Sequence, residues 1–221
     1  MATQFDMTWD SIKDTNRNNV AYMKLETGSK GNRVRIVSNP SEVDEHWEKD
    51  VNGGNHRIVC SGAKCLFCER GEKPITRYQM LVLDKNNWTP DNGYGADGAQ
   101  VKVLTVGRSV ITAIKQFALD PDYGNPTKYD IKIKKEGSGR DTRYSVSPSP
   151  KKSELTDEEK TAVENAPSLK DINKTPSNDE ILAMNLASLQ DMANDDDDDE
   201  DTSKAKGSED SDDEDDGWDN F

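Results

Sequence analysis

The chain has 221 residues, in which 29 lysines and arginines stand against 43 aspartates and glutamates, giving a formal net charge of -14. Residues 191–221 hold sixteen of these acids and only two lysines, so residues 1–190 have no net charge. Hydrophobic residues make up 32% of the chain and the mean hydropathy is -0.96, which excludes a chain folded from end to end and predicts one compact domain plus disordered segments.

The first half of the chain shows short strand-like runs. Residues 1–18 are polar without an apolar period and predict a flexible N-terminal arm. Residues 19–25 and 31–38 have apolar and β-branched content around the turn sequence TGSKGN, which predicts a hairpin. The two most apolar runs, 76–84 and 100–106, are expected to form the floor of the core.

The period then changes from that of a strand to that of a helix. Apolar residues recur at helical spacing across residues 107–119, and Asp120-Pro121 ends the segment. Residues 128–135 and 140–146, joined by EGSG, predict a second hairpin. About five or six short strands with one helix predict a mainly β fold, an OB-fold-like small barrel with an inserted zinc subdomain, although a β-sandwich explains the strands equally well.

Composition places the domain boundaries. Residues 19–150 form the predicted core with the zinc subdomain at 45–78, and residues 151–190 are a linker with short helices. Two capping boxes open these helices, Thr156 with Glu159 and Ser177 with Glu180. The second helix carries apolar residues on one side and either packs on the barrel or binds a partner; these residues are Ile181, Leu182, Leu186 and Leu189. Residues 191–221, with like charge in blocks, predict a disordered acidic tail.

All three cysteines lie within nine residues, which argues for a metal site before a disulfide in a reducing compartment. Cys60, Cys65 and Cys68 with His46 make four ligands of the kind that zinc prefers, and the Cys-x2-Cys spacing lets two sulfurs reach one ion. His56 competes for the fourth place, for which we favour His46. The alternative is three unligated buried thiols; we expect one structural zinc ion, because a closed Cys3His shell leaves no position for a catalytic water.

Cations and aromatic residues interleave between residues 123 and 144, and neighbouring strands extend the set. Cations neutralise phosphates while aromatic rings stack on bases, so the pattern predicts a surface for single-stranded nucleic acid. Alternating charges on a strand are also typical of a merely solvated face, and alternation leaves open whether Tyr129 belongs to the core. The predicted DNA-binding residues are Arg33, Arg35, Arg77, Tyr78, Lys102, Arg108, Tyr123, Lys128, Tyr129, Lys132, Lys134, Lys135, Arg140, Arg143 and Tyr144.

The chain ends in aromatic residues that a solubilising tail does not need. Trp218, Asp219, Asn220 and Phe221 therefore predict a partner-binding peptide. The tail is also an internal polyanion, which we expect to compete with DNA for the basic surface.

Together these features resemble the single-stranded DNA-binding proteins of T-even-like bacteriophages. The resemblance is carried by His46 about a dozen residues ahead of Cys60, by Cys65-Leu66-Phe67-Cys68, and by the acidic tail with its terminal aromatic. It implies a zinc-containing OB-fold core that coats single strands in replication, recombination and repair. It also implies that the tail recruits replication, recombination and repair proteins, and that the protein acts in a bacterial host.

No run approaches the ~18 apolar residues needed to span a bilayer, and the start MATQFDMTWD lacks the regions of a signal peptide. We expect a cytoplasmic protein that is not secreted and binds no small-molecule substrate. The sequence contains no GxxxxGK[ST], nucleophile elbow or HExxH motif, so we expect no enzyme. The competing hypothesis is an interaction protein, either a transcription-associated zinc module or an acidic DNA mimic.

Overall fold

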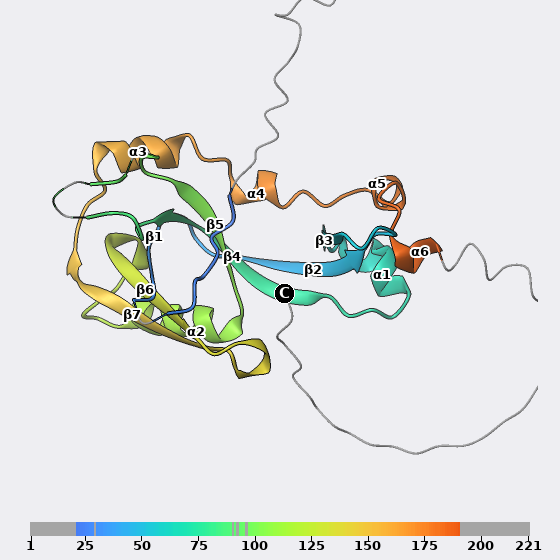
Figure 1. The fold of residues 1–221 in the computed structure, drawn as a ribbon, viewed down its shortest axis with the longest axis horizontal. Helices are drawn as coiled ribbons and strands as arrows, with labels where there is room; N and C mark the ends of the chain where they lie inside the picture. Colours follow the sequence, from blue (N-terminus) through green and yellow to red (C-terminus); the bar gives the residue numbers. More distant parts are fainter. Residues whose placement is uncertain (1–20, 29, 90, 92, 96, 191–221) are drawn as a thin grey trace, which may run out of the picture.

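The structure is a computed structural model that describes residues 21–28, 30–89, 91, 93–95 and 97–190. The predicted N-terminal arm, the acidic tail and the partner-binding residues Trp218 to Phe221 lie outside this part of the chain. No helix in the described ranges is long and apolar enough to cross a membrane. The predicted mainly β fold is confirmed, because one antiparallel sheet of seven strands dominates the described residues (Figure 1).

The sheet has the order β3-β2-β4-β1-β6-β7, and β5 pairs with β4 off this path. The ladder between described residues does not close into a ring, since β5 and β7 are not paired. The strands are β1 (Asn32–Ile36), β2 (Ser41–Lys49), β3 (Asn55–Val59), β4 (Ile75–Asp84), β5 (Val101–Val106), β6 (Tyr129–Glu136) and β7 (Arg143–Lys152). The helices are α1 (Leu66–Glu69), α2 (Arg108–Leu119), α3 (Asp157–Glu164), α4 (Leu169–Ile172), α5 (Asn178–Leu182) and α6 (Ala187–Gln190).

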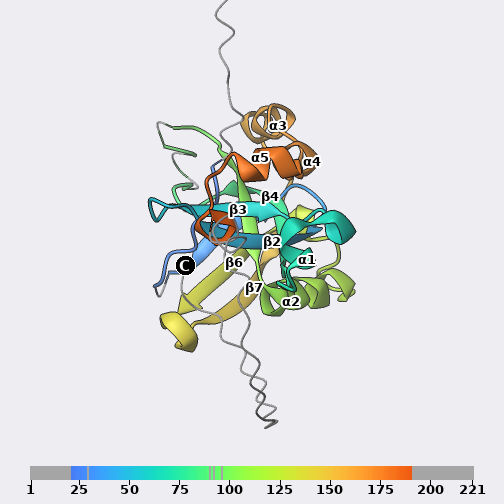
Figure 2. The same cartoon turned by 90° about the vertical axis from the view of Figure 1, so that its right-hand side faces the viewer.

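The long strand β4 belongs to two parts of the molecule. Its first half, from Ile75 to Gln79, pairs with β2, and its last residues pair with β1 along the same edge. We call β2, β3, residues 60–74 and the first half of β4 the metal arm, and the remaining strands with the second half of β4 the core sheet. The metal arm extends away from the core sheet in Figure 1 and faces the viewer in Figure 2.

The main hydrophobic core lies between the core sheet and α2. As predicted, the apolar runs in β4 and β5 supply its floor, with Val82 and Leu104 fully buried. The predicted helix is present, with Gly107 as its N-cap and Asp120 as its C-cap. Its apolar period places Val110 and Ile114 against the sheet, because residues four apart lie on one face of a helix.

The hairpin predicted over residues 19–38 is wrong. Residues 21–28 do not pair with β1; Tyr22 instead bridges Val103 of β5, and Thr27 bridges Lys135 of β6. The partners of β1 are β4 and β6. Turn residues suggested local pairing, but the backbone partners of this segment lie on strands far along the sequence.

The second predicted hairpin is present as β6 and β7. Along β6, Ile131 and Ile133 are fully buried while Lys132 is exposed, which matches the predicted alternation. The strand β7 is longer than predicted, because it runs through the Ser- and Pro-rich sequence to Lys152. A register shift between Tyr129 and Ile131 bends the pair at that end.

Both predicted capping boxes are confirmed. The Thr156 hydroxyl accepts a hydrogen bond from the Glu159 backbone N–H at 3.2 Å, and Ser177 does the same for Glu180 at 3.3 Å. The helix that Ser177 opens is short, and the chain turns at Asn185, whose φ is 50°. This turn places Ile181 and Leu186 in a second hydrophobic core with Phe67 of the metal arm. The helices α5 and α6 therefore pack on the arm rather than on the core sheet. The side chain of Leu182 is 57% exposed.

A network of buried charges fixes α3 on the outer side of the core sheet, away from α2. Asp130 on β6 accepts hydrogen bonds from Arg33 and Arg35, at 2.8 and 2.7 Å. Lys85 lies 3.7 Å from the same carboxylate and 2.7 Å from Glu159 of α3. Because Glu159 is only 1% exposed, its charge depends on these partners for compensation.

This network predicts an acid-sensitive element of stability. Although burial alone raises the pKa of Glu159, hydrogen bonds from Lys85, Tyr94 and the Thr156 backbone lower it below its ordinary value of 4.5. The folded pKa lies below the unfolded one, so this stabilisation is present above pH 4.5 and is lost as the pH falls through the folded pKa. We expect Glu159→Gln to lower the free energy of unfolding by about 3 kcal/mol at neutral pH. Urea titrations at neutral and acidic pH check this; a difference from wild type that does not shrink in acid would contradict it.

Candidate metal centre and nucleic-acid interface

Four side chains from three consecutive elements meet in the metal arm. His46 lies on β2 and faces the side of the strand opposite to Glu45 and Trp47. Cys60 follows β3, where its backbone N–H continues the ladder by donating to Asp44 at 2.9 Å. Cys65 is the N-cap of α1 and Cys68 lies within that helix, so one helical turn brings both sulfurs to the same side.

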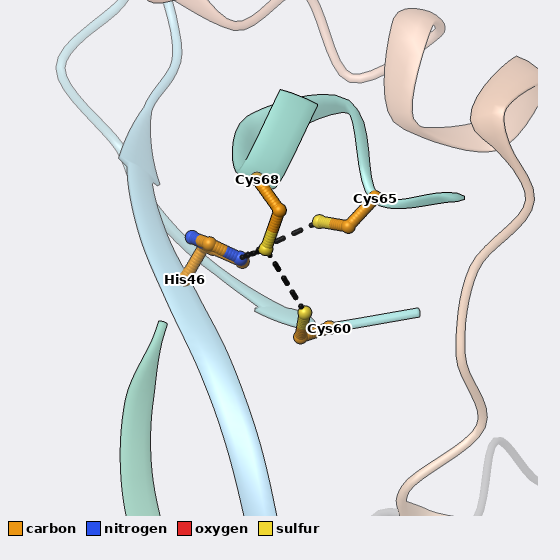
Figure 3. A group of neighbouring side chains, drawn as sticks. All are labelled: His46, Cys60, Cys65 and Cys68. Carbon is orange, nitrogen blue, oxygen red and sulfur yellow. Dashed lines mark hydrogen bonds between the residues drawn. The ribbon is translucent and has the colours of Figure 1, made fainter. Parts of the chain in front are cut away.

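The predicted ligand set is brought together. The side chains of His46, Cys60, Cys65 and Cys68 point toward one another in Figure 3, and their ligand atoms all lie within 4.8 Å of one another. His46 Nε2 is 3.4 Å from Cys65 Sγ and 3.5 Å from Cys68 Sγ. Cys60 Sγ and Cys68 Sγ are 3.5 Å apart. These residues could hold one metal ion.

Burial and neighbouring groups shift the pKa values of His46, Cys65 and Cys68. Burial lowers the pKa of His46, against the opposing charges of Glu48 and Asp44, and this favours the neutral imidazole that binds metal. Burial, followed by the neighbouring Cys60 and Cys65 sulfurs, raises the pKa of Cys68 to about 12. Burial also opposes ionisation of Cys65, but backbone N–H groups of Cys68 and Phe67 outweigh it and lower the pKa of this thiol. A cation bound among the sulfurs would offset their mutual repulsion. Its positive charge stabilises the thiolate form in which cysteines bind metal.

The structure separates the two histidines that competed for the fourth position. His56 Nε2 lies 2.8 Å from the Asp50 carboxylate, and His56 is not among the clustered ligands. His46 is the histidine in the cluster, as expected. His46 also packs against Phe67, with ring centroids 5.1 Å apart, which fixes the imidazole plane.

Some of the predicted DNA-binding residues gather on the outer face of β1, β6 and β7. Arg33 and Lys132 are direct cross-strand partners, and Lys134 lies two residues further along the same side of β6. Opposite these lysines on β7 are Ser147 and Ser145, both exposed and too short to cover them. Arg143 lies on this side opposite Glu136, the carboxylate that pairs with Lys134.

Two of the predicted DNA-binding residues are corrected by the structure. Arg35 is 1% exposed, and its guanidinium donates to Asp130 and to the Ser153 carbonyl and hydroxyl, so no phosphate can reach it. Tyr129 is fully buried in the main core, where its hydroxyl donates to the Gly124 carbonyl at 3.2 Å. Both side chains therefore serve the fold.

The other predicted residues are spread over the molecule. Tyr78 and Tyr123 are half-buried against the main core, and Lys102 pairs with Asp84 at 2.6 Å. Lys135 and Tyr144 are cross-strand partners on the opposite side of the β6–β7 hairpin from Lys132. The remaining positions are Arg77, half-buried in the metal arm, and Arg108, Lys128 and Arg140, which are exposed.

Sequence reasoning missed three aromatic residues at or near the surface. Trp88 lies beside the outer face, with its ring centroid 4.9 Å from the Arg33 guanidinium and 5.1 Å from Lys85 Nζ. Tyr22, which bridges β5, and Trp47, on the β2–β3 hairpin of the metal arm, are 50% and 37% exposed. In the sequence each of these residues is only an aromatic residue among polar neighbours. That pattern does not show whether the ring lies at the surface or in the core. Comparisons of the chain with protein-family models, with curated proteins and with solved structures found no match.

Proposed function

We propose that this chain is a non-enzymatic protein that binds single-stranded DNA without sequence preference, with one structural zinc ion in the metal arm. The proposal places it with the helix-destabilising proteins of T-even-like bacteriophages, which act in replication, recombination and repair. The observation that carries it is the outer face of β1, β6 and β7, where Arg33, Lys132, Lys134 and Arg143 share one side of the sheet.

The donor set favours zinc. Three thiolates and one imidazole are the soft and borderline ligands of structural zinc sites, and they complete its tetrahedral shell. Bonds of about 2.3 Å to sulfur place tetrahedral sulfurs ~3.8 Å apart, close to the 3.5 Å between Cys60 and Cys68. With all four positions taken by protein, the ion has no place for a reactive water, so its role is to stabilise the fold.

The strand pattern favours an OB-fold for the core sheet. Five strands, β1, β4, β5, β6 and β7, carry α2 between the third and the fourth, and the ladder is open between β5 and β7. Residues 21–28 bridge β5 and β6 near the opening. An OB-fold is a five-stranded and partly open barrel of this kind, and its strands present a face to oligonucleotides.

The face itself suits a phosphate backbone. Lys132 is exposed and Lys134 is half-exposed, and the small serines opposite them leave room for an extended chain. Trp88 beside Arg33 adds an aromatic ring to the row of cations. Cations that neutralise phosphates and rings that stack on bases are the two components of sequence-tolerant single-strand binding.

The decisive experiment compares filter binding of single-stranded and duplex DNA at several salt concentrations. We expect the single strand to bind more tightly and both affinities to fall as salt rises, because counterions are released on binding. No binding to single strands even at low salt would contradict the proposal and favour an interaction protein that has no nucleic-acid partner.

Replacing both Lys132 and Lys134 with alanine is expected to weaken single-strand binding and to make its salt dependence shallower. The slope of log K against log salt should fall by roughly 0.7 for each phosphate that the variant no longer neutralises. Lys115→Ala is the matched control, since this exposed lysine lies on α2 at the other side of the sheet. Equal losses of affinity in the double variant and the control would move the DNA-binding surface away from β6.

A further inference from the structure

Two exposed aromatic side chains are linked through polar contacts where residues 21–28 reach the β2–β3 hairpin of the metal arm. Trp47 lies on β2 directly opposite Arg57 of β3. Tyr22 comes from the segment that bridges β5, and its hydroxyl is 3.5 Å from Arg57 Nη1. Residues far apart in the sequence are thus joined at Arg57, which is the cross-strand neighbour of Trp47 and a hydrogen-bond partner of Tyr22.

A buried carboxylate holds this arrangement in place. Glu45 is 2% exposed, accepts a hydrogen bond from the Trp47 indole N–H at 3.0 Å, and pairs with Arg57 through its second oxygen. Arg57 in turn donates to the Asn173 side chain at 2.9 Å. The polar end of each ring is thereby fixed, while 50% of Tyr22 and 37% of Trp47 stay accessible to solvent.

Fixed, accessible rings are unusual for residues that serve only the fold. A tryptophan or tyrosine that contributes to a core buries its ring, whose area supplies the stabilisation, and its polar group finds a hydrogen-bond partner. Here the polar tips are engaged within the protein and ring surface remains exposed. Rings that are already ordered lose little side-chain entropy when a flat ligand stacks on them, which is the property of a prepared binding surface.

The charge on this side of the arm is complementary to a polyanion. Strand alternation puts Lys49 on the same side of β2 as Trp47, and the cross-strand partners on that side include Arg57 and Arg77. Glu45, the acid on this side, is buried and paired with Arg57. The acids Glu42, Asp44 and Glu48 lie on the opposite side together with His46.

We propose that Trp47 and Tyr22 form a base-stacking site for single-stranded DNA where residues 21–28 reach the β2–β3 hairpin of the metal arm. This inference rests on the proposed function and extends it to residues that the basic pattern of the sequence did not indicate. Residues 22 to 27 link the site to β6, where Thr27 bridges Lys135. That stretch spans at most about 18 Å, so one strand covering the ~4–16 nucleotides of an OB-fold can reach from the stacking site to this end of β6.

The test uses the full chain and an oligothymidylate longer than the ~16 nucleotides that an OB-fold covers. Trp47→Ala and Tyr22→Ala should each weaken binding roughly five- to hundredfold without changing the salt slope, because stacking releases no counterions. Trp47→Phe should keep most of the affinity, since it retains a ring. Val51→Ala, an equally exposed apolar residue at the far end of the arm, should bind like wild type.

A second measurement separates stacking from a structural role. Saturating DNA should quench tryptophan fluorescence less in Trp47→Phe than in wild type. The variant lacks the tryptophan on which the base stacks, whereas the other tryptophans are the same in both proteins. Normal affinity of both alanine variants, with quenching unchanged in Trp47→Phe, would overturn the inference while wild-type binding still upheld the proposed function. If wild type itself failed to bind the oligonucleotide, the proposed function would fall first.

Discussion

Replacing Cys65 with serine is expected to release the metal ion and to unfold the metal arm. The arm has only a small core, built from Ile58, Phe67 and Cys65 together with Ile181 and Leu186 of the C-terminal segment. In such sites the free energy of metal binding is free energy of folding. At a metal concentration a thousand times the dissociation constant, its loss costs about 4 kcal/mol of stability, measurable as metal content and as a lower melting temperature.

The same substitution should free α5 and α6. Leu186 packs in the core that contains Cys65, and the Asn185 carbonyl accepts a hydrogen bond from the Val51 N–H at 3.1 Å. Proteolysis near residues 178–190 should therefore accelerate in Cys65→Ser and in chelator-treated wild type. His56→Ala is the control, because this histidine is bound to Asp50 and should leave metal content unchanged. A metal-free protein with wild-type melting temperature and proteolysis rate would refute the structural role of the site.

Deleting residues 191–221 is expected to raise the affinity for single-stranded DNA, most strongly at low salt. This segment carries sixteen acids and two lysines, so we expect it to compete with phosphates for the cations of the outer face by an attraction that salt screens. The deletion should also increase the melting of duplex DNA. Titration of intact and truncated protein with one oligonucleotide at several salt concentrations measures the effect.

A shorter deletion is the control for that prediction. Removing only Trp218 to Phe221 takes away one aspartate and both aromatic residues, so most of the charge remains. This variant should lose partner recruitment without the full gain in DNA affinity. If the long deletion bound DNA no better than the intact chain at low salt, the tail would not compete for the surface, and a partner-binding role alone would remain.

Features that depend on neighbours in the sequence were predicted well. The two capping boxes at Thr156 and Ser177 are present because each needs only four consecutive residues and a helix start. The metal ligands came together for a similar reason, since His46 and the three cysteines fall within 23 residues of chain. A short β-hairpin and one helical turn suffice to assemble them.

Features that depend on distant partners were predicted poorly. Alternation on β1 assigned Arg35 to an exposed face, but Asp130, 95 residues away, and the Ser153 groups bury it in a charge network. The strands β2 and β3 were not predicted as strands. The sequence of β2, SEVDEHWEK, is rich in acids and shows no clear alternation of apolar and polar residues, although Glu45 and Trp47 share one side of the strand. The segment 21–28 likewise takes partners on β5 and β6 that no local pattern reveals.

The strand β4 belongs to both the metal arm and the core sheet, and this also implies an order of folding. The β2–β3 hairpin of the metal arm pairs close neighbours in the sequence, so little loop-closure entropy opposes its formation, whereas β1 reaches β6 across about a hundred residues, as from Asn32 to Ile133. We expect the arm to form early and to present the first half of β4 already extended. The second half then continues the same strand as a template on which β5 and β1 assemble, so early formation of the candidate metal site would speed the assembly of the distant core.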